Sequence, residues 1–440
     1  MNSAPRVTFE HTPESAWQPP RRRFLKQLMG GMAAAAVLPS LESLDAGSAA
    51  SALSSAIQDD EGYWALVKDQ FALREDLILM NAANLCPSPY PVMEAVFGLT
   101  RDVDSDPSFQ NRAKFGELRQ ETRRLLAEYL GADPEEIVIT RNTSEGNNVV
   151  IGGLALEPGD EVVIWDQNHP TCNVAWDVRA RRYGYTVRRV ATPREVQSGD
   201  DLLRPFLNAL TGKTRVLAFS HVSNISGVAL PAKALCGHAG DRGVITLVDG
   251  AQTFGAEVLD LHDMGCDFFT GSAHKWPMGP KEAGVLYARR ERIADIWPLI
   301  VGIGWAEGEG DAVPRFEALG QRDDARIAAM GRAIEFHNTI GKHKIEARVR
   351  SLAQEVKRQL LKQIPGVMFH TPQEQEVSSG VVVFHPPGVD LDSALARLYG
   401  EHNVGCAVMR GDFAGIRLSP HIYNTMEQVE RAVSAIAGLL

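Results

Sequence analysis

The sequence predicts an α/β protein with a mainly parallel sheet of seven strands and a smaller C-terminal α/β domain. Seven short runs rich in Val, Ile or Phe are each bounded by Gly, Asp or Pro and are too short for helices. They occupy 136–140, 160–165, 185–190, 215–220, 244–249, 267–272 and 284–289. Segments of helical length, such as 143–156 and 231–240, lie between several of them. Strands that alternate with helices favour a parallel sheet covered on both faces.

Changes of pattern along the 440 residues predict four regions. Residues 1–50 form a signal region and 51–80 a mostly polar, helical lead-in, followed by a large domain over 81–322. A linking helix and a small domain then fill 323–440. The expected elements of this last region are helices at 324–340, 343–363 and 391–401, strands at 379–385, 402–408 and 415–420, and a last helix from 425. The composition, 44% hydrophobic and 23% charged, is typical of a chain with a large core.

The N-terminal region carries an export pattern. Arg21-Arg22-Arg23-Phe24-Leu25-Lys26 fits the twin-arginine pattern R-R-x-F-L-K, and a weakly apolar stretch rich in Gly and Ala follows at 28–38. That stretch is too short to span a bilayer, so we expect a signal removed near 46–52 rather than a stable membrane anchor. The alternative is a chance basic start. A twin-arginine signal predicts that the twin-arginine machinery exports the protein, already folded, to the periplasm.

Charge and cysteine usage exclude other classes of protein. The net charge is −10 and no long basic stripe exists, which argues against binding nucleic acid. The five cysteines are scattered without a C-x-x-C pair, which argues against a disulfide framework or a metal site. We expect them to be small buried apolar side chains.

A lysine follows the run at 267–272, where ligands bind in parallel sheets. The stretch Gly271-Ser272-Ala273-His274-Lys275-Trp276 leads into a turn rich in Gly and Pro, and its small and apolar residues suit a buried amine. A lysine in such a pocket can have a lowered pKa and attack an aldehyde to form a Schiff base. Ser272 and His274 could donate to a phosphate. A chance S-x-H-K sequence is the alternative.

Two further strand ends carry polar residues. Asp249 follows the run at 244–249, where a carboxylate can keep a pyridine nitrogen protonated and make the ring an electron sink. Gln252 could then donate to the ring's phenolic oxygen. Asn224, in His221-Val222-Ser223-Asn224, could reach that oxygen or the substrate. The alternative for Asp249 is an ordinary turn aspartate.

The remaining candidates lie at helix starts and in the small domain. Thr143 and Ser144 begin an expected helix, where backbone N–H groups can bind phosphate, although such residues are also ordinary N-caps. His169 could stack on a planar ring and take part in proton transfer, or be an incidental loop residue. Arg417 could bind a substrate carboxylate, or lie on the solvent face of a strand.

The order of these motifs, H…HVSNxxG…DGAQ…SxHKW…RxSPHxYNT, resembles class V aminotransferases of fold type I, which include isopenicillin N epimerases and cysteine desulfurases. The resemblance runs from about Asn81 to the C-terminus. It implies a pyridoxal 5′-phosphate enzyme that acts on an amino-acid moiety through an external aldimine and an α-carbanion. It also implies a homodimer whose active site lies between domains and between subunits.

The resemblance assigns roles to the candidate residues. It implies that Lys275 is the aldimine lysine and proton carrier, that Asp249 holds the pyridine nitrogen, and that His169 stacks on the ring. Gln252 and Asn224 would contact the ring oxygen, and Arg417 would bind the substrate carboxylate. The phosphate would be held by Thr143, Ser144, Ser272 and His274. Asn84 is a further candidate for substrate binding. A phosphate contact from the partner chain would come from near 302–305.

Departures from the family narrow the expected reaction. Desulfurases carry a reactive cysteine shortly before the carboxylate-binding arginine, but 409–415 contains none and Cys406 lies on the preceding expected strand. The C-terminal motif and Phe316-Glu317-Ala318-Leu319-Gly320 are closer to the isopenicillin N epimerase-like branch. The alternatives are a periplasmic enzyme that tailors the glutamate side chain of a pyoverdine-type siderophore and a C–S lyase. A non-catalytic binding protein is disfavoured because Lys275, Asp249 and Arg417 are all present.

Overall fold

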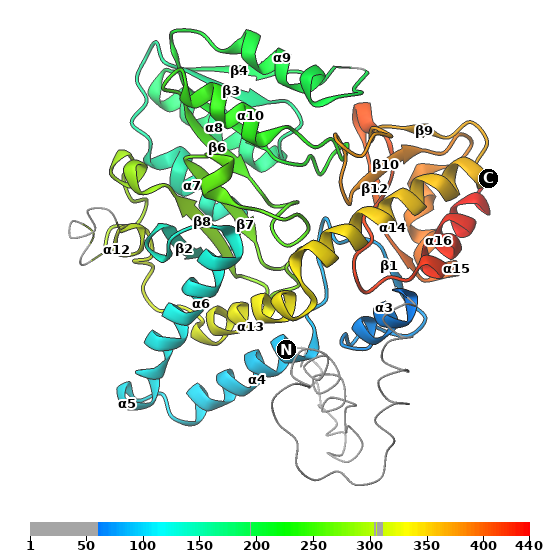
Figure 1. Ribbon diagram of the computed structural model, residues 1–440, viewed down its shortest axis with the longest axis horizontal. Helices are drawn as coiled ribbons and strands as arrows, with labels where there is room; N and C mark the ends of the chain where they lie inside the picture. Colours follow the sequence, from blue (N-terminus) through cyan, green and yellow to red (C-terminus); the bar gives the residue numbers. More distant parts are fainter. Residues whose placement is uncertain (1–59, 194, 303–304, 306–310) are drawn as a thin grey trace, which may run out of the picture. The chain divides into compact units, whose positions relative to one another are not determined.

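The computed structural model describes residues 60–193, 195–302, 305 and 311–440 (Figure 1). The twin-arginine pattern at 21–26 lies outside the described residues, as do 303–304 of the predicted partner-chain contact. The chain divides into two units, Met1–Leu66 and Val67–Leu440. Of the first unit, only the beginning of helix α3 (Asp60–Lys68) is described. Over the described ranges, no helix is long and apolar enough to cross a membrane.

A seven-stranded sheet forms the centre of the large domain, in the order β2-β8-β7-β6-β5-β3-β4. The strands are β2 (Ile137–Thr140), β3 (Glu161–Trp165), β4 (Thr186–Val190), β5 (Thr214–Ser220), β6 (Ile245–Asp249), β7 (Phe268–Ser272) and β8 (Gly284–Ala288). The pairs within β4-β3-β5-β6-β7 are parallel, and β8 alone runs antiparallel to its two neighbours. This sheet confirms the predicted fold class, and every predicted run of the large domain forms a strand.

Both faces of the sheet are buried at its central strands β6, β7 and β8, which explains why these strands are mostly apolar, whereas the edge strand β4 is largely exposed. On β6 and β7, Val248 and Phe269 join one core, whereas the preceding residues Leu247 and Phe268 join the other. Alternate side chains of a strand point to opposite faces, so two layers of helices are needed. The first layer includes α6 (Lys114–Leu130), α9 (Gly199–Ala209), α10 (Ala232–Gly240), α11 (Leu261–Met264) and α13 (Asp324–Ile340). The second includes α7 (Thr143–Gly153), α8 (Pro170–Tyr183) and α12 (Ala312–Phe316).

The small domain has its own sheet and its own core. Its antiparallel sheet has the order β12-β13-β10-β9, and its helices pack with it around a separate buried cluster. The strands are β9 (Met368–Phe369), β10 (Val382–His385), β12 (Ala407–Met409) and β13 (Gly415–Leu418). The helices are α14 (Lys342–Gln363), α15 (Leu391–His402) and α16 (Met426–Ala437). Helix α4 (Tyr90–Ser105) packs against α13, and the short α5 (Phe109–Arg112) precedes α6.

One predicted strand of the small domain is wrong in detail. The expected run at 402–408 divides into β11 (Val404–Gly405), which pairs with β1 (Ile78–Leu79), and β12, which pairs with β13. Cys406 lies between the two strands rather than on one of them. The chain changes sheets at this residue, and a hydrophobic pattern cannot show which partner each half of a run will choose.

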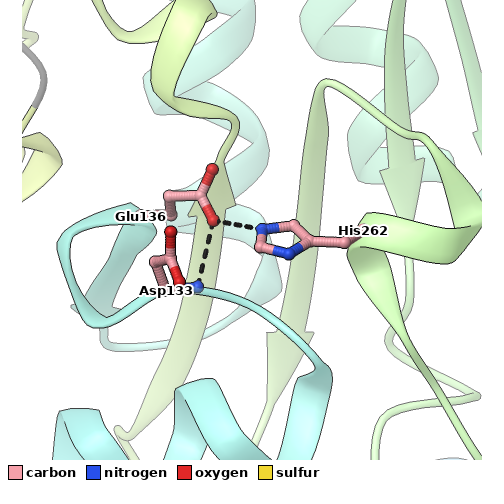
Figure 2. A group of neighbouring side chains, drawn as sticks. All are labelled: Asp133, Glu136 and His262. Carbon is pink, nitrogen blue, oxygen red and sulfur yellow. Dashed lines mark hydrogen bonds and ion pairs between the residues drawn. The ribbon is translucent and has the colours of Figure 1, made fainter.

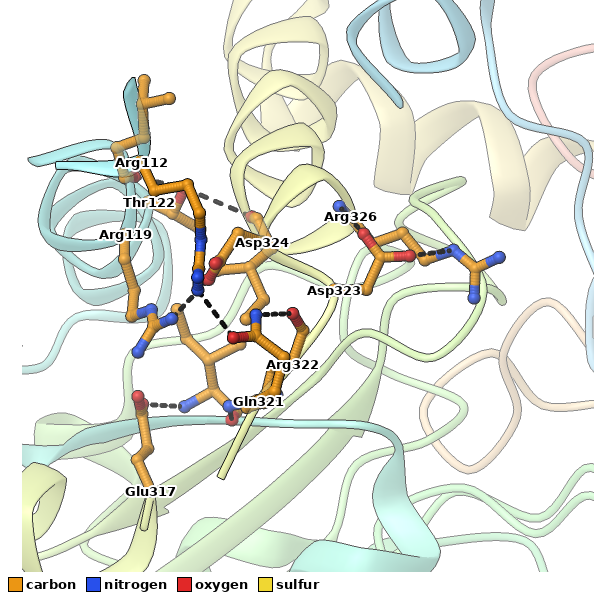
Figure 3. Close-up of polar contacts among 12 residues, drawn as sticks. Arg112, Arg119, Thr122, Glu317, Gln321, Arg322, Asp323, Asp324 and Arg326 are labelled. Atoms are coloured by element: carbon orange, nitrogen blue, oxygen red, sulfur yellow. Dashed lines mark hydrogen bonds and ion pairs between the residues drawn. The ribbon is translucent and has the colours of Figure 1, made fainter. Parts of the chain in front are cut away.

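Two polar clusters outside the cavity tie the elements of the large domain together. The buried Glu317 carboxylate, which is labelled in Figure 3, accepts from Arg123 Nη2 at 3.1 Å and from Ile139 N at 2.6 Å. These contacts fix the α12–α13 connection to α6 and β2. The second cluster joins the turn before β2 to α11: His262 Nε2 lies 2.7 Å from Glu136 Oε2, which also accepts from Asp133 N at 3.1 Å (Figure 2). The Glu136 carboxylate is therefore already engaged in hydrogen bonds within the protein.

Candidate active site

A cavity of about 270 Å³ lies at the carboxyl ends of the parallel strands of the large domain. Arg417, from β13 of the small domain, completes its wall. All the residues predicted from the sequence to form the site line this cavity. They are Asn84, Thr143, Ser144, His169, Asn224, Asp249, Gln252, Ser272, His274, Lys275 and Arg417. The fold therefore brings together motifs that are spread over more than three hundred positions of the sequence.

Lys275 lies in the turn that follows β7. The turn is closed by hydrogen bonds from Met278 N to Lys275 O at 2.9 Å and from Gly279 N to Ala273 O at 2.7 Å. Burial lowers the pKa of Lys275 to about 8, the nearby Asp249 opposes that shift, and the Arg417 cation adds to it. At neutral pH the amine is therefore uncharged far more often than a lysine in water, and an uncharged amine is a nucleophile and a base.

Asp249 is the last residue of β6 and is 4% exposed. Its Oδ1 accepts from Ala251 N at 3.0 Å, and its Oδ2 accepts from Asn147 Nδ2 at 2.9 Å. Sequence reasoning missed Asn147, which lies on α7 and is 3% exposed. The available signal was its position four residues after Thr143, on the same face of the helix.

The N-terminus of α7 forms one end of the cavity. Asn142 caps the helix by accepting from Glu145 N at 3.0 Å, and the backbone N–H groups of such a first turn favour an anion. Thr143 Oγ1 lies 2.7 Å from Ser272 Oγ, which also accepts from Thr143 N at 2.9 Å. These hydroxyl groups join the helix to the end of β7. They supply donors suited to phosphate.

Two imidazoles in the cavity are held in the neutral form. Burial lowers the pKa of His274 to about 4, and the positive charges of Lys275 and Lys281 add to that shift. Burial is also the main cause that lowers the pKa of His169, again with a contribution from Lys275. His169 caps α8, because its Nδ1 accepts from Thr171 N at 3.3 Å. A neutral imidazole anchored in this way presents a planar face and retains a ring N–H donor.

Gln252 is fixed by its surroundings. Its Nε2 donates to Ala83 O at 3.0 Å, and its Oε1 accepts from Trp276 Nε1 at 2.8 Å. An amide nitrogen carries two hydrogens, so one donor remains beyond the bond to Ala83.

Arg417 is the most informative side chain for substrate binding. It is 6% exposed, and it donates from Nη1 to Asn224 O at 2.9 Å and from Nη2 to Asn81 Oδ1 at 3.2 Å. Within the described part of the chain, its Nε has no hydrogen-bond partner and no carboxylate forms an ion pair with it. Burial lowers its pKa to about 10, so the guanidinium stays charged at neutral pH. A buried and unneutralised guanidinium facing a cavity favours an anionic ligand.

The donors in the cavity fit pyridoxal phosphate. The α7 terminus with Thr143 and Ser272 suits the phosphate, Asp249 suits the pyridine nitrogen, and the Lys275 amine suits the aldehyde. The charged guanidinium of Arg417, which lines the same cavity, suits a second anion, such as the carboxylate of a substrate.

Comparisons with known proteins agree with this arrangement. The aminotransferase class-V family matches residues 87–432. The isopenicillin N epimerase of Amycolatopsis lactamdurans is 31% identical over 393 residues, which cover 86% of this chain and 98% of that protein. A probable cysteine desulfurase 2 of Mycobacterium leprae is 30% identical over 342 residues, 72% of this chain and 79% of that protein.

A similar solved structure is a mutant of C-DES with glycine covalently linked to its pyridoxal-phosphate cofactor. It superposes with a TM-score of 0.77 at 24% identity and covers 84% of this chain and 99% of its own. That likeness supports fold type I. With a family match over most of its length and a donor set that fits the cofactor, the chain belongs to the class V aminotransferase family of pyridoxal-phosphate enzymes.

Proposed function

We propose that this enzyme binds the free amine and carboxylate of an amino-acid moiety and acts at its α-carbon, in the manner of an isopenicillin N epimerase. The observation that carries the proposal is Arg417, a buried cation that lines the cavity and forms no ion pair with a carboxylate of the described residues. A substrate carboxylate in the cavity would neutralise that charge. The relative of 31% identity, which is named an isopenicillin N epimerase, supports the choice of reaction.

We assign the proton transfer to Lys275. Bound pyridoxal phosphate supplies an electron sink that stabilises negative charge at the α-carbon. A lysine with a pKa of about 8 can take a proton from that carbon and return one near neutral pH. Asp249, whose carboxylate accepts from two N–H donors, would hold the pyridine nitrogen, and Gln252 and Asn224 would contact the ring oxygen. The neutral His169 is suited to lie against a ring face.

The cysteines support an epimerase-like reaction over desulfuration. All five lie among the described residues, where they are buried and unpaired. Burial raises the pKa of Cys406 to about 12, so it is a poor nucleophile at neutral pH. The connection between β12 and β13, at 410–414, contains no cysteine. A C–S lyase reaction needs no cysteine of the enzyme, so it remains the alternative chemistry of the same site.

The test is exchange of the substrate's α-hydrogen in deuterated water, because epimerisation, transamination and elimination all break that bond. The holoenzyme would be incubated with isopenicillin N, L-glutamate and L-cystine, and the α-hydrogen signal followed by NMR. We expect exchange with at least one of these probes and loss of exchange when its α-carboxylate is converted to an amide. Inversion of configuration would then indicate epimerisation, and pyruvate formation from L-cystine would indicate elimination.

Two results would contradict the proposal. Equal exchange rates for a carboxylate and its amide would show that Arg417 does not select the substrate. If the protein bound the cofactor but exchanged the α-hydrogen of none of the probes, the proposed reaction would not occur with these substrates.

We also propose that the active enzyme is a homodimer. Several large apolar side chains of α8 and of the 299–301 segment are exposed, namely Val174, Val178, Leu299, Ile300 and Val301. Helix α8 and the 299–301 segment adjoin, because a Cβ atom added at Gly152 would contact both Leu299 and Arg179. Exposed apolar patches of this kind favour association with a second protein surface. Sedimentation equilibrium should give a dimer that Val178→Asp weakens; a monomer with full exchange activity would contradict this.

A further inference from the structure

We propose that Asn147 and Thr270 act as a positioning pair that orients Asp249 toward the ring nitrogen of the cofactor. The inference rests on the proposed function, since it concerns the same cavity, but neither residue belongs to the motifs found in the sequence. The pair fixes the direction in which the Asp249 carboxylate points. Its test therefore measures the affinity for the cofactor.

The three side chains form one continuous chain of hydrogen bonds. Thr270 Oγ1 donates to Asn147 Oδ1 at 2.7 Å, and Asn147 Nδ2 donates to Asp249 Oδ2 at 2.9 Å. Because the hydroxyl occupies the amide oxygen, the NH₂ group must face the carboxylate. All three side chains are buried, with exposed fractions of 3% for Asn147, 0% for Thr270 and 4% for Asp249.

The backbone makes this contact local to the active site. Asp249 and Thr270 are register partners on the neighbouring parallel strands β6 and β7. Asn147 lies on α7, which packs against β7, and its amide bonds to both strands at once. Gly146 permits that approach, because a Cβ atom there would lie 2.9 Å from the methyl carbon of Thr270. The same helix also presents its N-terminus at the other end of the cavity.

Asn147 therefore connects the helix whose N-terminus suits the phosphate to the carboxylate that suits the ring nitrogen. The carboxylate has one donor from the backbone of Ala251 and one from Asn147, so loss of the second leaves only the bond from Ala251 N to fix its orientation. A carboxylate that no longer points into the cavity cannot hold a proton on a ring nitrogen there. The expected consequence is weaker cofactor binding, with the protein still folded.

The test is a double-mutant cycle on the affinity for pyridoxal phosphate, measured by absorbance titration of the apoprotein. Asn147→Ala should weaken binding by about tenfold or more, in line with a hydrogen bond to a charged group. In the Asp249→Ala background the same change should weaken binding less than twofold, because the group through which it acts is gone. Thr270→Val should weaken binding to a smaller extent. Thr270→Ser, which keeps the hydroxyl group, should bind the cofactor as tightly as the wild-type protein.

The matched control is Asn148→Ala, which removes the next asparagine of the same helix. Its Nδ2 bonds to the backbone oxygen of Ser144 rather than to Asp249. We expect unchanged affinity for this variant. The inference would be overturned if Asn147→Ala lowered the affinity equally in the wild-type and Asp249→Ala backgrounds, or if Thr270→Ser lowered it as much as Thr270→Val. Asn147 would then have a purely structural role. Failure of the wild-type apoprotein itself to bind pyridoxal phosphate would instead contradict the function proposed above.

Discussion

Replacing Lys275 by alanine is expected to abolish exchange of the substrate α-hydrogen. Of the described lysines, Lys275 alone lines the cavity, and burial gives it the pKa of about 8 that a base near neutral pH requires. Removal of a positioned acid–base group typically costs about 10²–10⁴-fold in rate. The loss here should reach at least that range, because the residue also attaches the cofactor. The measurement is the rate of α-deuterium incorporation under saturating cofactor.

The control for this change is Lys281→Ala, which removes an exposed lysine close enough to influence His274. It should retain exchange, since Lys281 does not line the cavity. If Lys275→Ala exchanged hydrogen at the parent rate, another base would carry the proton and our assignment of the reaction to Lys275 would be wrong.

Replacing Arg417 by methionine is expected to produce the second large effect. Methionine keeps part of the side-chain volume but removes the guanidinium, so the substrate carboxylate would enter a buried cavity without its partner. Loss of such a charge-assisted contact costs about 2–5 kcal/mol, or roughly 30- to 5,000-fold in kcat/KM. The loss should be concentrated in KM if Arg417 binds the ground state and the transition state equally.

A comparison of substrates separates this effect from general damage to the enzyme. In the parent enzyme a carboxylate substrate should exchange much faster than its amide, and Arg417→Met should remove that difference. Arg417→Lys should recover only part of it, because an ammonium lacks the planar, two-pronged donor arrangement. An unchanged preference for the carboxylate in Arg417→Met would show that another group binds it.

The sequence was sufficient to predict the fold class because the central strands are buried on both faces. Runs such as the one ending at Asp249 are mostly apolar and end at turn residues, so their number and approximate bounds could be identified. The predicted site residues follow these strands, and the carboxyl ends of parallel strands meet at one edge of a sheet. Their common location in one cavity was therefore expected from topology.

The residues that support the site could not be identified in the same way. Asn147 and Asn81 hold Asp249 and Arg417 by single hydrogen bonds between elements that lie far apart in the sequence. Their local sequences, within a helix and just after a two-residue strand, carry no pattern that names a partner. The division of 402–408 between two sheets was missed for the same reason, because pairing partners depend on the tertiary structure.

The most direct test of this account is to reduce the holoenzyme with borohydride, digest it, and identify the peptide that retains the cofactor mass. Borohydride reduces the carbon–nitrogen double bond between lysine and cofactor to a single bond, and the resulting secondary amine survives digestion. We predict a single labelled peptide, which contains Lys275, and no label in Lys275→Ala. A label on another lysine, or no label on a protein that has bound pyridoxal phosphate, would contradict the central assignment.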